Sequence, residues 1–226
     1  MSPMTDGSIR TRPVGEVVAD DYRRGAVFKQ FGIDFCCGGG RTVEEACARK
    51  GVDIEALERA LESSDLPRGE DRMPDPRTWD PGFLADYIVQ VHHSYCREAL
   101  PVLRAFSRKV AQVHGAHTPE LISVDEAVQA LSEEMTAHMA SEENEVFPAI
   151  KSGEGASAAL EQMEAEHEAA GELMAEIRRD TADFTPPPEA CATWRAMYAK
   201  LEEFEGDLHR HVHLENNVLF PAVRGG

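Results

Sequence analysis

The strongest constraint on the fold is a short pattern that occurs twice. Its first copy is His138–Ile150 and its second is His211–Val223. In each copy a His is followed four residues later by Glu, six residues later by Asn, and then by Phe-Pro-Ala. On a helix, a spacing of four residues leaves two side chains roughly 40° apart around the axis and roughly 6 Å along it. The repeat therefore predicts helices on which an imidazole and a carboxylate converge on one metal ion.

Four long amphipathic segments carry the repeat. Apolar residues recur at helical spacing in each of them, and prolines or glycines separate them. Asp80 and Pro81 are typical of a helix start, Ser123 with Glu126 reads as a capping box, and Pro148 is expected to limit the second helix. The predicted helices are 80–114, 123–147, 156–180 and 189–220. Short connections between long helices favour an antiparallel four-helix bundle, and we find no strand pattern of useful length.

A smaller helical domain is predicted before the bundle. Residues 14–32 are expected to form one helix that Gly32 ends, and shorter helices are expected at 42–51, where Thr42 and Glu45 make a capping box, and at 53–63. The stretch that follows is rich in proline and charge. The predicted organisation is a small domain at 1–66, a linker at 67–79 and the bundle at 80–226.

The charge of the chain is uneven and bears on its partners. Of the net charge of −18, residues 1–70 contribute 13 acids against 10 bases, which leaves 28 acids against 13 bases for the remainder. Such a surface is expected to repel nucleic acid and anionic membrane. No run approaches the roughly 18 apolar residues of a membrane helix, and residues 1–13 lack the apolar core of a signal peptide. We expect a cytoplasmic protein.

Six donors form the predicted metal site. Each predicted long helix carries one inward-facing histidine, and the two repeats add carboxylates, which gives His93, His138, Glu142, His167, His211 and Glu215. Four imidazoles and two carboxylates exceed one four-coordinate zinc but suit two metals, with Glu142 and Glu215 as bridges. The absence of thiolate favours iron or manganese, and redox chemistry favours iron. Without the repeat, His93 or His167 would be interpreted as a core histidine.

The remaining histidines and several nearby acids have other expected roles. Surface roles are expected for the histidines that flank the predicted ligands or lie near a loop, namely His92, His114, His117, His209 and His213. Acids near the ligand histidines are candidates for outer partners, which accept a hydrogen bond from a ligand histidine: Glu134, Glu166 and Asp207. A solvated surface position is an equally good interpretation of these acids.

The five cysteines fall into two groups. Cys36 and Cys37, on a loop before three glycines, are predicted to be a redox or soft-metal pair. Buried helical positions are expected for Cys47, Cys96 and Cys191. For Cys96, three residues after His93, an approach to the metal site is the open alternative. No CxxC spacing is present, and the odd number argues against a disulfide framework.

These motifs together resemble the Repair of Iron Centres (RIC) family of bacterial di-iron proteins. The likeness rests on Asp34-Phe-Cys-Cys-Gly-Gly39, on both His-x-x-x-Glu copies, on Glu166-His167-Glu-Ala-Ala-Gly-Glu172 and on Thr185-Pro-Pro-Pro-Glu-Ala-Cys191. It implies an all-α chain in which a small helical domain with paired cysteines precedes a hemerythrin-like antiparallel four-helix bundle. It also implies two carboxylate-bridged iron ions held by the same six donors. The choice of His93 over His92 rests on the distance to Leu100 and Pro101.

The resemblance implies repair of iron–sulfur clusters damaged by nitric oxide or oxidative stress. Iron delivery from the di-iron centre, nitric oxide binding there, and enzymatic nitric oxide reduction all stay open. Cys36 and Cys37 would handle iron transfer or electrons, damaged iron–sulfur proteins would be partners, and a homodimer is expected. The alternatives are a hemerythrin-like oxygen or nitric oxide binding or sensing protein without repair activity, and a purely structural metal bundle.

Overall fold

The computed structural model describes residues 9–64, 75–153 and 157–225. Two compact units make up the chain. The first comprises residues 1–80 together with 212–226, and the second comprises 81–211. The boundary at residue 211 falls inside one continuous helix, α10 (Ala192–Leu214). Within the described residues the chain is helical, and its β structure is one isolated bridge between Pro13 and Thr42. The all-α prediction is confirmed.

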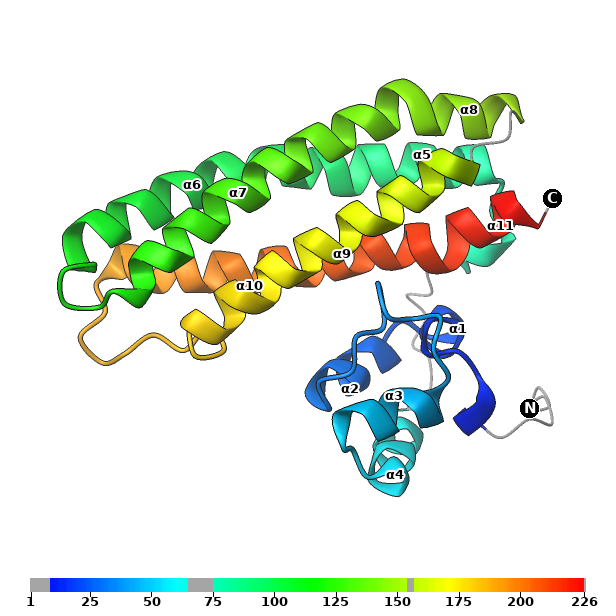
Figure 1. Ribbon diagram of the computed structural model, residues 1–226, viewed down its shortest axis with the longest axis horizontal. Helices are drawn as coiled ribbons and strands as arrows, with labels where there is room; N and C mark the ends of the chain where they lie inside the picture. Colours follow the sequence, from blue (N-terminus) through cyan, green and yellow to red (C-terminus); the bar gives the residue numbers. More distant parts are fainter. Residues whose placement is uncertain (1–8, 65–74, 154–156, 226) are drawn as a thin grey trace, which may run out of the picture. The chain divides into compact units, whose positions relative to one another are not determined.

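The second unit consists of long helices that run in alternating directions (Figure 1). Hydrogen bonds and ring contacts join α10 to both of its neighbours, as in the Tyr95–Phe204 pair (ring centroids 6.2 Å apart) and the Arg178–Glu205 pair (2.7 Å). The core is apolar and includes Leu84, Ile88, Leu103, Leu131, Met135, Leu160 and Phe204, each at most 2% exposed. Its elements are α5 (Pro81–Ile88), η3 (Val89–His93), α6 (Ser94–His114), α7 (Glu120–Ser141), η4 (Glu142–Val146), α8 (Phe147–Ser152), α9 (Ser157–Asp180) and α10 (Ala192–Leu214).

In its described residues, the first unit holds the four short helices α1 to α4 and the C-terminal segment of the chain. The capping box of Thr42 with Glu45 is present at the start of α3 (Val43–Lys50). Gly51, which adopts the left-handed conformation (φ 68°), ends this helix. The apolar core of this unit includes Val14, Val17, Phe28, Val43 and Leu57. Its helices are α1 (Val14–Asp20), α2 (Arg24–Gln30), α3 (Val43–Lys50) and α4 (Ile54–Ser64), and the C-terminal segment adds η5 (Glu215–Leu219) and α11 (Phe220–Arg224).

The prediction of one helix over residues 14–32 was wrong. The chain turns after Asp20, and Asp21 has an extended backbone (φ −155°). The carboxylate of Asp21 accepts hydrogen bonds from the backbone N–H of Arg23 (3.1 Å) and from its side chain, a local bond that competes with the helix. Helix α2 then begins at Arg24. Much of the predicted linker, at residues 67–74, lies outside the described residues, and the 3₁₀ turn η2 (Pro76–Thr78) occupies its end.

The predicted limits of the second and fourth long helices were also wrong. Helix α7 begins at Glu120, so Ser123 lies inside it. Neither Phe-Pro ends its helix, because a π-turn precedes each proline: the N–H of Phe147 bonds the carbonyl of Glu142, and that of Phe220 bonds the carbonyl of Glu215. The wider turn gives the proline ring room and already breaks the regular bonding ladder, so the helical path continues.

Candidate metal centre

Three of the six predicted ligands lie in π-turns. His93 is the last residue of η3, while Glu142 and Glu215 are the first residues of η4 and η5. A π-turn adds a residue to one helical turn and changes the direction of the side chains beside it, which is why such turns recur at functional sites. The other three predicted ligands lie in regular helices: His138 in α7, His167 in α9 and His211 in α10.

Five of the six predicted ligands meet inside the bundle. Each is at most 4% exposed. One carboxylate oxygen of Glu142, Oε2, lies 3.2 Å from Nε2 of His93 and 3.2 Å from Nε2 of His138. Nε2 of His167 lies 3.1 Å from Nε2 of His138. Burial of this many polar atoms around one point is costly unless they share protons or a cation.

Glu215 completes the set from one turn beyond His211. Its place follows from the continuous helical path of α10 into η5. The donors form two groups, in each of which the ligand atoms lie within 4.8 Å of one another: His93, Glu142, His211 and Glu215 in one, and His138, Glu142, His167 and Glu215 in the other. Both carboxylates belong to both groups, while each group has its own pair of imidazoles. Two cations with two shared carboxylates would fit this arrangement.

Carboxylates outside the donor set orient two of the histidines. Nδ1 of His93 lies 2.6 Å from Glu143, which also accepts a hydrogen bond from Arg97. Partial burial favours a raised pKa for Glu143, but the bonds from His93 and Arg97 outweigh it and the pKa is lowered. An ionised Glu143 accepts a hydrogen bond from Nδ1–H of His93, and the lone pair of Nε2 then points into the site.

Glu166 plays the same part for His138. Its carboxylate lies 2.8 Å from Nδ1 of His138 and accepts a bond from Gln162 (2.9 Å). Burial tends to raise the pKa of Glu166, whereas the bonds from Gln162 and His138 lower it, and the net shift is downward. Glu166 was among the predicted outer partners. Glu143 was not, although its place directly after Glu142 was a signal.

The other two predicted outer partners differ in position. Glu134 is exposed. Asp207 accepts a hydrogen bond from His92, with 2.9 Å between its carboxylate and Nδ1. The surface role expected for His92 was wrong: the side chain is 1% exposed and its ring stacks on that of His211 (centroids 5.6 Å apart, planes 5° apart). The surface role expected for His213 was also wrong, since it is 2% exposed.

The double-cysteine loop is built around Asp34. One oxygen of its carboxylate, Oδ1, accepts the backbone N–H groups of Cys36 (2.9 Å) and Cys37 (3.1 Å), and the other, Oδ2, accepts that of Gly38 (2.8 Å). No disulfide joins the two thiols, whose sulfurs lie 4.0 Å apart. Cys36 is buried and Cys37 is half-buried. The hydrogen bond with Cys37 and burial raise the pKa of the Cys36 thiol, so Cys36 is held protonated.

The remaining cysteines are only partly as predicted. Cys47 and Cys96 are buried in helices, at 2% and 0% exposure. Cys191 was expected to be buried as well, but it is exposed. It precedes the first residue of α10, Ala192, so it is not on the helical face that packs into the core.

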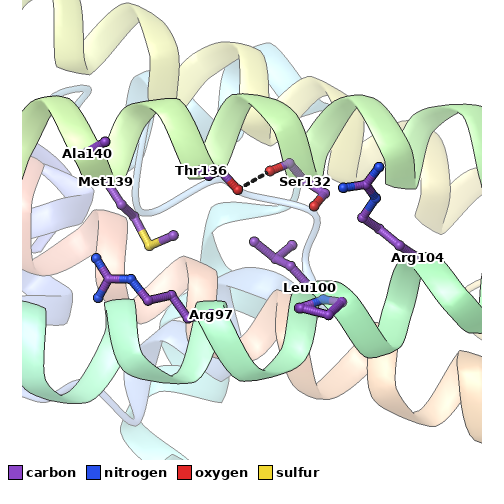
Figure 2. Close-up of a pocket in the computed structure, with 8 residues that line it drawn as sticks. Arg97, Leu100, Arg104, Ser132, Thr136, Met139 and Ala140 are labelled. Atoms are coloured by element: carbon purple, nitrogen blue, oxygen red, sulfur yellow. Dashed lines mark hydrogen bonds between the residues drawn. The ribbon is translucent and has the colours of Figure 1, made fainter.

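A groove of about 400 Å³ lies between α6 and α7 (Figure 2). Its lining is Arg97, Leu100, Pro101, Arg104, Ser132, Thr136, Met139 and Ala140. Leu100 and Met139 point into it from opposite helices, and the hydroxyl of Thr136 bonds the carbonyl of Ser132 (2.7 Å). None of the six predicted ligands lines the groove.

Two family models match the chain. The Hemerythrin HHE cation binding domain matches residues 84–223, and a domain of unknown function, DUF542, matches residues 10–65. Among the described residues, no helix combines the length and apolar character needed to cross a membrane.

Curated relatives extend over nearly the whole chain. The iron-sulfur cluster repair protein YtfE of Citrobacter koseri is 39% identical over 222 residues, which is 97% of this chain and 99% of that protein. The proteins of the same name from Escherichia coli O157:H7 and Salmonella paratyphi B are 39% and 40% identical, and each match covers 96% of this chain and 98% of the relative.

Proposed function

Because this chain belongs to the family of iron–sulfur cluster repair proteins with a hemerythrin HHE domain, we propose that it restores damaged iron–sulfur clusters. The observation that carries the proposal is a buried His/Glu site with two shared carboxylates in a chain that also holds a double-cysteine loop. A bundle that only stored or carried a ligand would have no need of that loop.

We propose that two iron ions bind per chain. The terminal ligands would be His93, His138, His167 and His211, with Glu142 and Glu215 as bridges, which agrees with the membership of both carboxylates in both donor groups. Imidazole and carboxylate donors without thiolate suit iron. Iron supplies redox chemistry and affinity for small diatomic ligands. The protein's own residues hold the lone pairs of the imidazoles toward the centre, through Glu143 and Glu166.

The clients would be iron–sulfur proteins damaged by nitric oxide or oxidative stress. Cys36 and Cys37 would handle iron or electrons on the way to the client, since two thiols 4.0 Å apart can share a soft metal ion. The bundle would deliver iron, or capture or reduce nitric oxide. We propose that the protein works in the cytoplasm, as a homodimer.

A repair assay tests this proposal. A purified enzyme with a nitric-oxide-damaged iron–sulfur cluster is incubated with the iron-loaded protein, and recovery of its activity is measured. The double variant Cys36→Ser, Cys37→Ser is expected to keep its iron and its iron spectrum, yet to lose most of the recovery. Cys191→Ser, at an exposed cysteine, is the matched control and is expected to repair as the native chain does. Full recovery with the double variant would remove the cysteines from the mechanism.

The alternative is a hemerythrin-like protein that binds or senses oxygen or nitric oxide without repair. The match to the HHE domain favours it as the second candidate. Anaerobic reaction of the reduced protein with nitric oxide distinguishes capture from reduction. The reaction is monitored through the iron spectrum and the formation of nitrous oxide. Stable nitrosylation indicates capture, and nitrous oxide indicates reduction. Reversible nitrosyl binding in a protein that restores no cluster would favour the alternative.

A further inference from the structure

Asn217, in the second copy of the repeat, bonds the backbone of the double-cysteine loop. Its side-chain amide donates to the carbonyl oxygen of Cys36 (3.0 Å) and, at longer range, to that of Phe35 (3.5 Å). Both bonds join residues more than 180 positions apart in the sequence, and all of these residues belong to the first unit. Asn217 lies in η5, two residues after Glu215.

Two glycines leave room for this side chain. A Cβ at Gly15 would lie 2.5 Å from Cγ of Asn217, well inside contact distance. A Cβ at Gly39 would lie 3.1 Å from the same Cγ and 2.7 Å from the carbonyl oxygen of Phe35. The N–H of Gly15 also bonds the carbonyl of Gly39 (2.8 Å). Helix α1, the loop and η5 therefore meet around one amide.

Aromatic side chains also hold the double-cysteine loop in this position. The ring of His213 packs against those of Tyr22 (centroids 5.7 Å apart) and Phe35 (5.9 Å). Tyr22 and Phe35 also contact each other edge to face, at 6.0 Å. Phe35 directly precedes Cys36, so its ring fixes the loop at the residue before the cysteine pair.

The equivalent asparagine of the first copy, Asn144, makes a local hydrogen bond instead. Asn144 is exposed, and its amide donates to the carbonyl of Ala140, one turn earlier in the same helical path (2.6 Å). The same residue at the same place in the repeat thus makes a local bond in one copy and a long-range bond in the other. The sequence itself provides a matched control.

We propose that Asn217 is a positioning residue for Cys36: it seats the double-cysteine loop on the second copy of the repeat and keeps the Cys36 thiol out of solvent. Opening this seat is then the step that makes Cys36 available to a client. The inference concerns the access of the thiol, and it holds whether the bundle delivers iron or binds nitric oxide.

The test measures alkylation of single cysteines by iodoacetamide, resolved by mass spectrometry of peptides. Asn217→Asp keeps the size of the side chain but removes the donor and places negative charge against two carbonyl oxygens. We expect Cys36 to react about tenfold faster or more, as the loss of two hydrogen bonds predicts. Asn144→Asp is expected to leave the rate at Cys36 unchanged.

Cys47 distinguishes local opening from unfolding. It is buried in α3 of the same unit and makes no part of the seat. Faster reaction at Cys36 with an unchanged rate at Cys47 supports the proposal. An unchanged rate at Cys36 overturns it, and so does an equal rise at both cysteines, because Asn217 would then only stabilise the fold.

Gly15→Ala probes the same seat from α1 and serves where Asn217→Asp fails to fold. Alanine is otherwise favourable in a helix, so its expected effect on Cys36 comes from collision with Asn217. Adding Asn217→Ala to Gly15→Ala removes the collision, so the two changes should raise the rate by less than the product of their separate effects. Multiplicative effects would contradict the contact.

Discussion

The two copies of the repeat have the same key residues but different surroundings. In the first copy, Nδ1 of His138 is held by the carboxylate of Glu166. In the second, the ring of His211 stacks on His92, which is itself held by Asp207. Glu142 is followed by a glutamate that bonds His93, whereas Glu215 is followed by Asn216. The two copies share their donor residues, and the residues around those donors differ.

This difference separates what a metal centre requires from what a particular chain adds. Both copies place a carboxylate at the start of a π-turn, and both carboxylates belong to both donor groups. The acids and aromatic rings behind the histidines are free to differ, because they act on the centre only through a ligand. The second copy also seats the double-cysteine loop through Asn217.

The largest expected effect tests the equivalence of the two carboxylates. Glu142→Ala and Glu215→Ala should each lower bound iron well below about two per chain, since either change removes a donor from both groups. Iron per chain is measured by elemental analysis of the loaded, desalted protein. Glu145→Ala, an exposed position in the same π-turn as Glu142, is expected to bind iron normally. Loss in only one of the two ligand variants would show that the copies are not equivalent.

The sequence predicted which donor residues come together better than it predicted the path of the helices. The spacing of four residues follows from helix geometry alone, so His138 with Glu142 and His211 with Glu215 could be paired in advance. The π-turns could not, because Phe-Pro ordinarily signals a helix end and a π-turn has no sequence signature of its own. The capping box at Thr42 was found because both of its bonds are local.

Long-range partners were out of reach of the sequence for a related reason. His92 lies next to a ligand, and a regular helix would turn it about 100° away from the site. Its burial depends on η3 and on Asp207, 115 residues away. Asn217 was recognised as part of the repeat, but its bond to Cys36 joins residues 181 apart. No local pattern specifies such a contact.

The smallest expected effect tests the divergent neighbours. Glu166→Gln removes the charge that holds Nδ1 of His138, and we expect iron affinity to fall by roughly 10- to 100-fold. His92→Phe keeps an aromatic ring against His211 and loses only the bond to Asp207, so the fall should stay below about tenfold. Affinity is measured by competition with a chelator, and Glu168→Gln, an exposed position on the helix of Glu166, is the control. An equal loss in the two variants would show that the stacked His92 orients His211 as firmly as a carboxylate orients His138. The two copies would then differ in the residues that orient their histidines, but these residues would contribute equally to iron affinity.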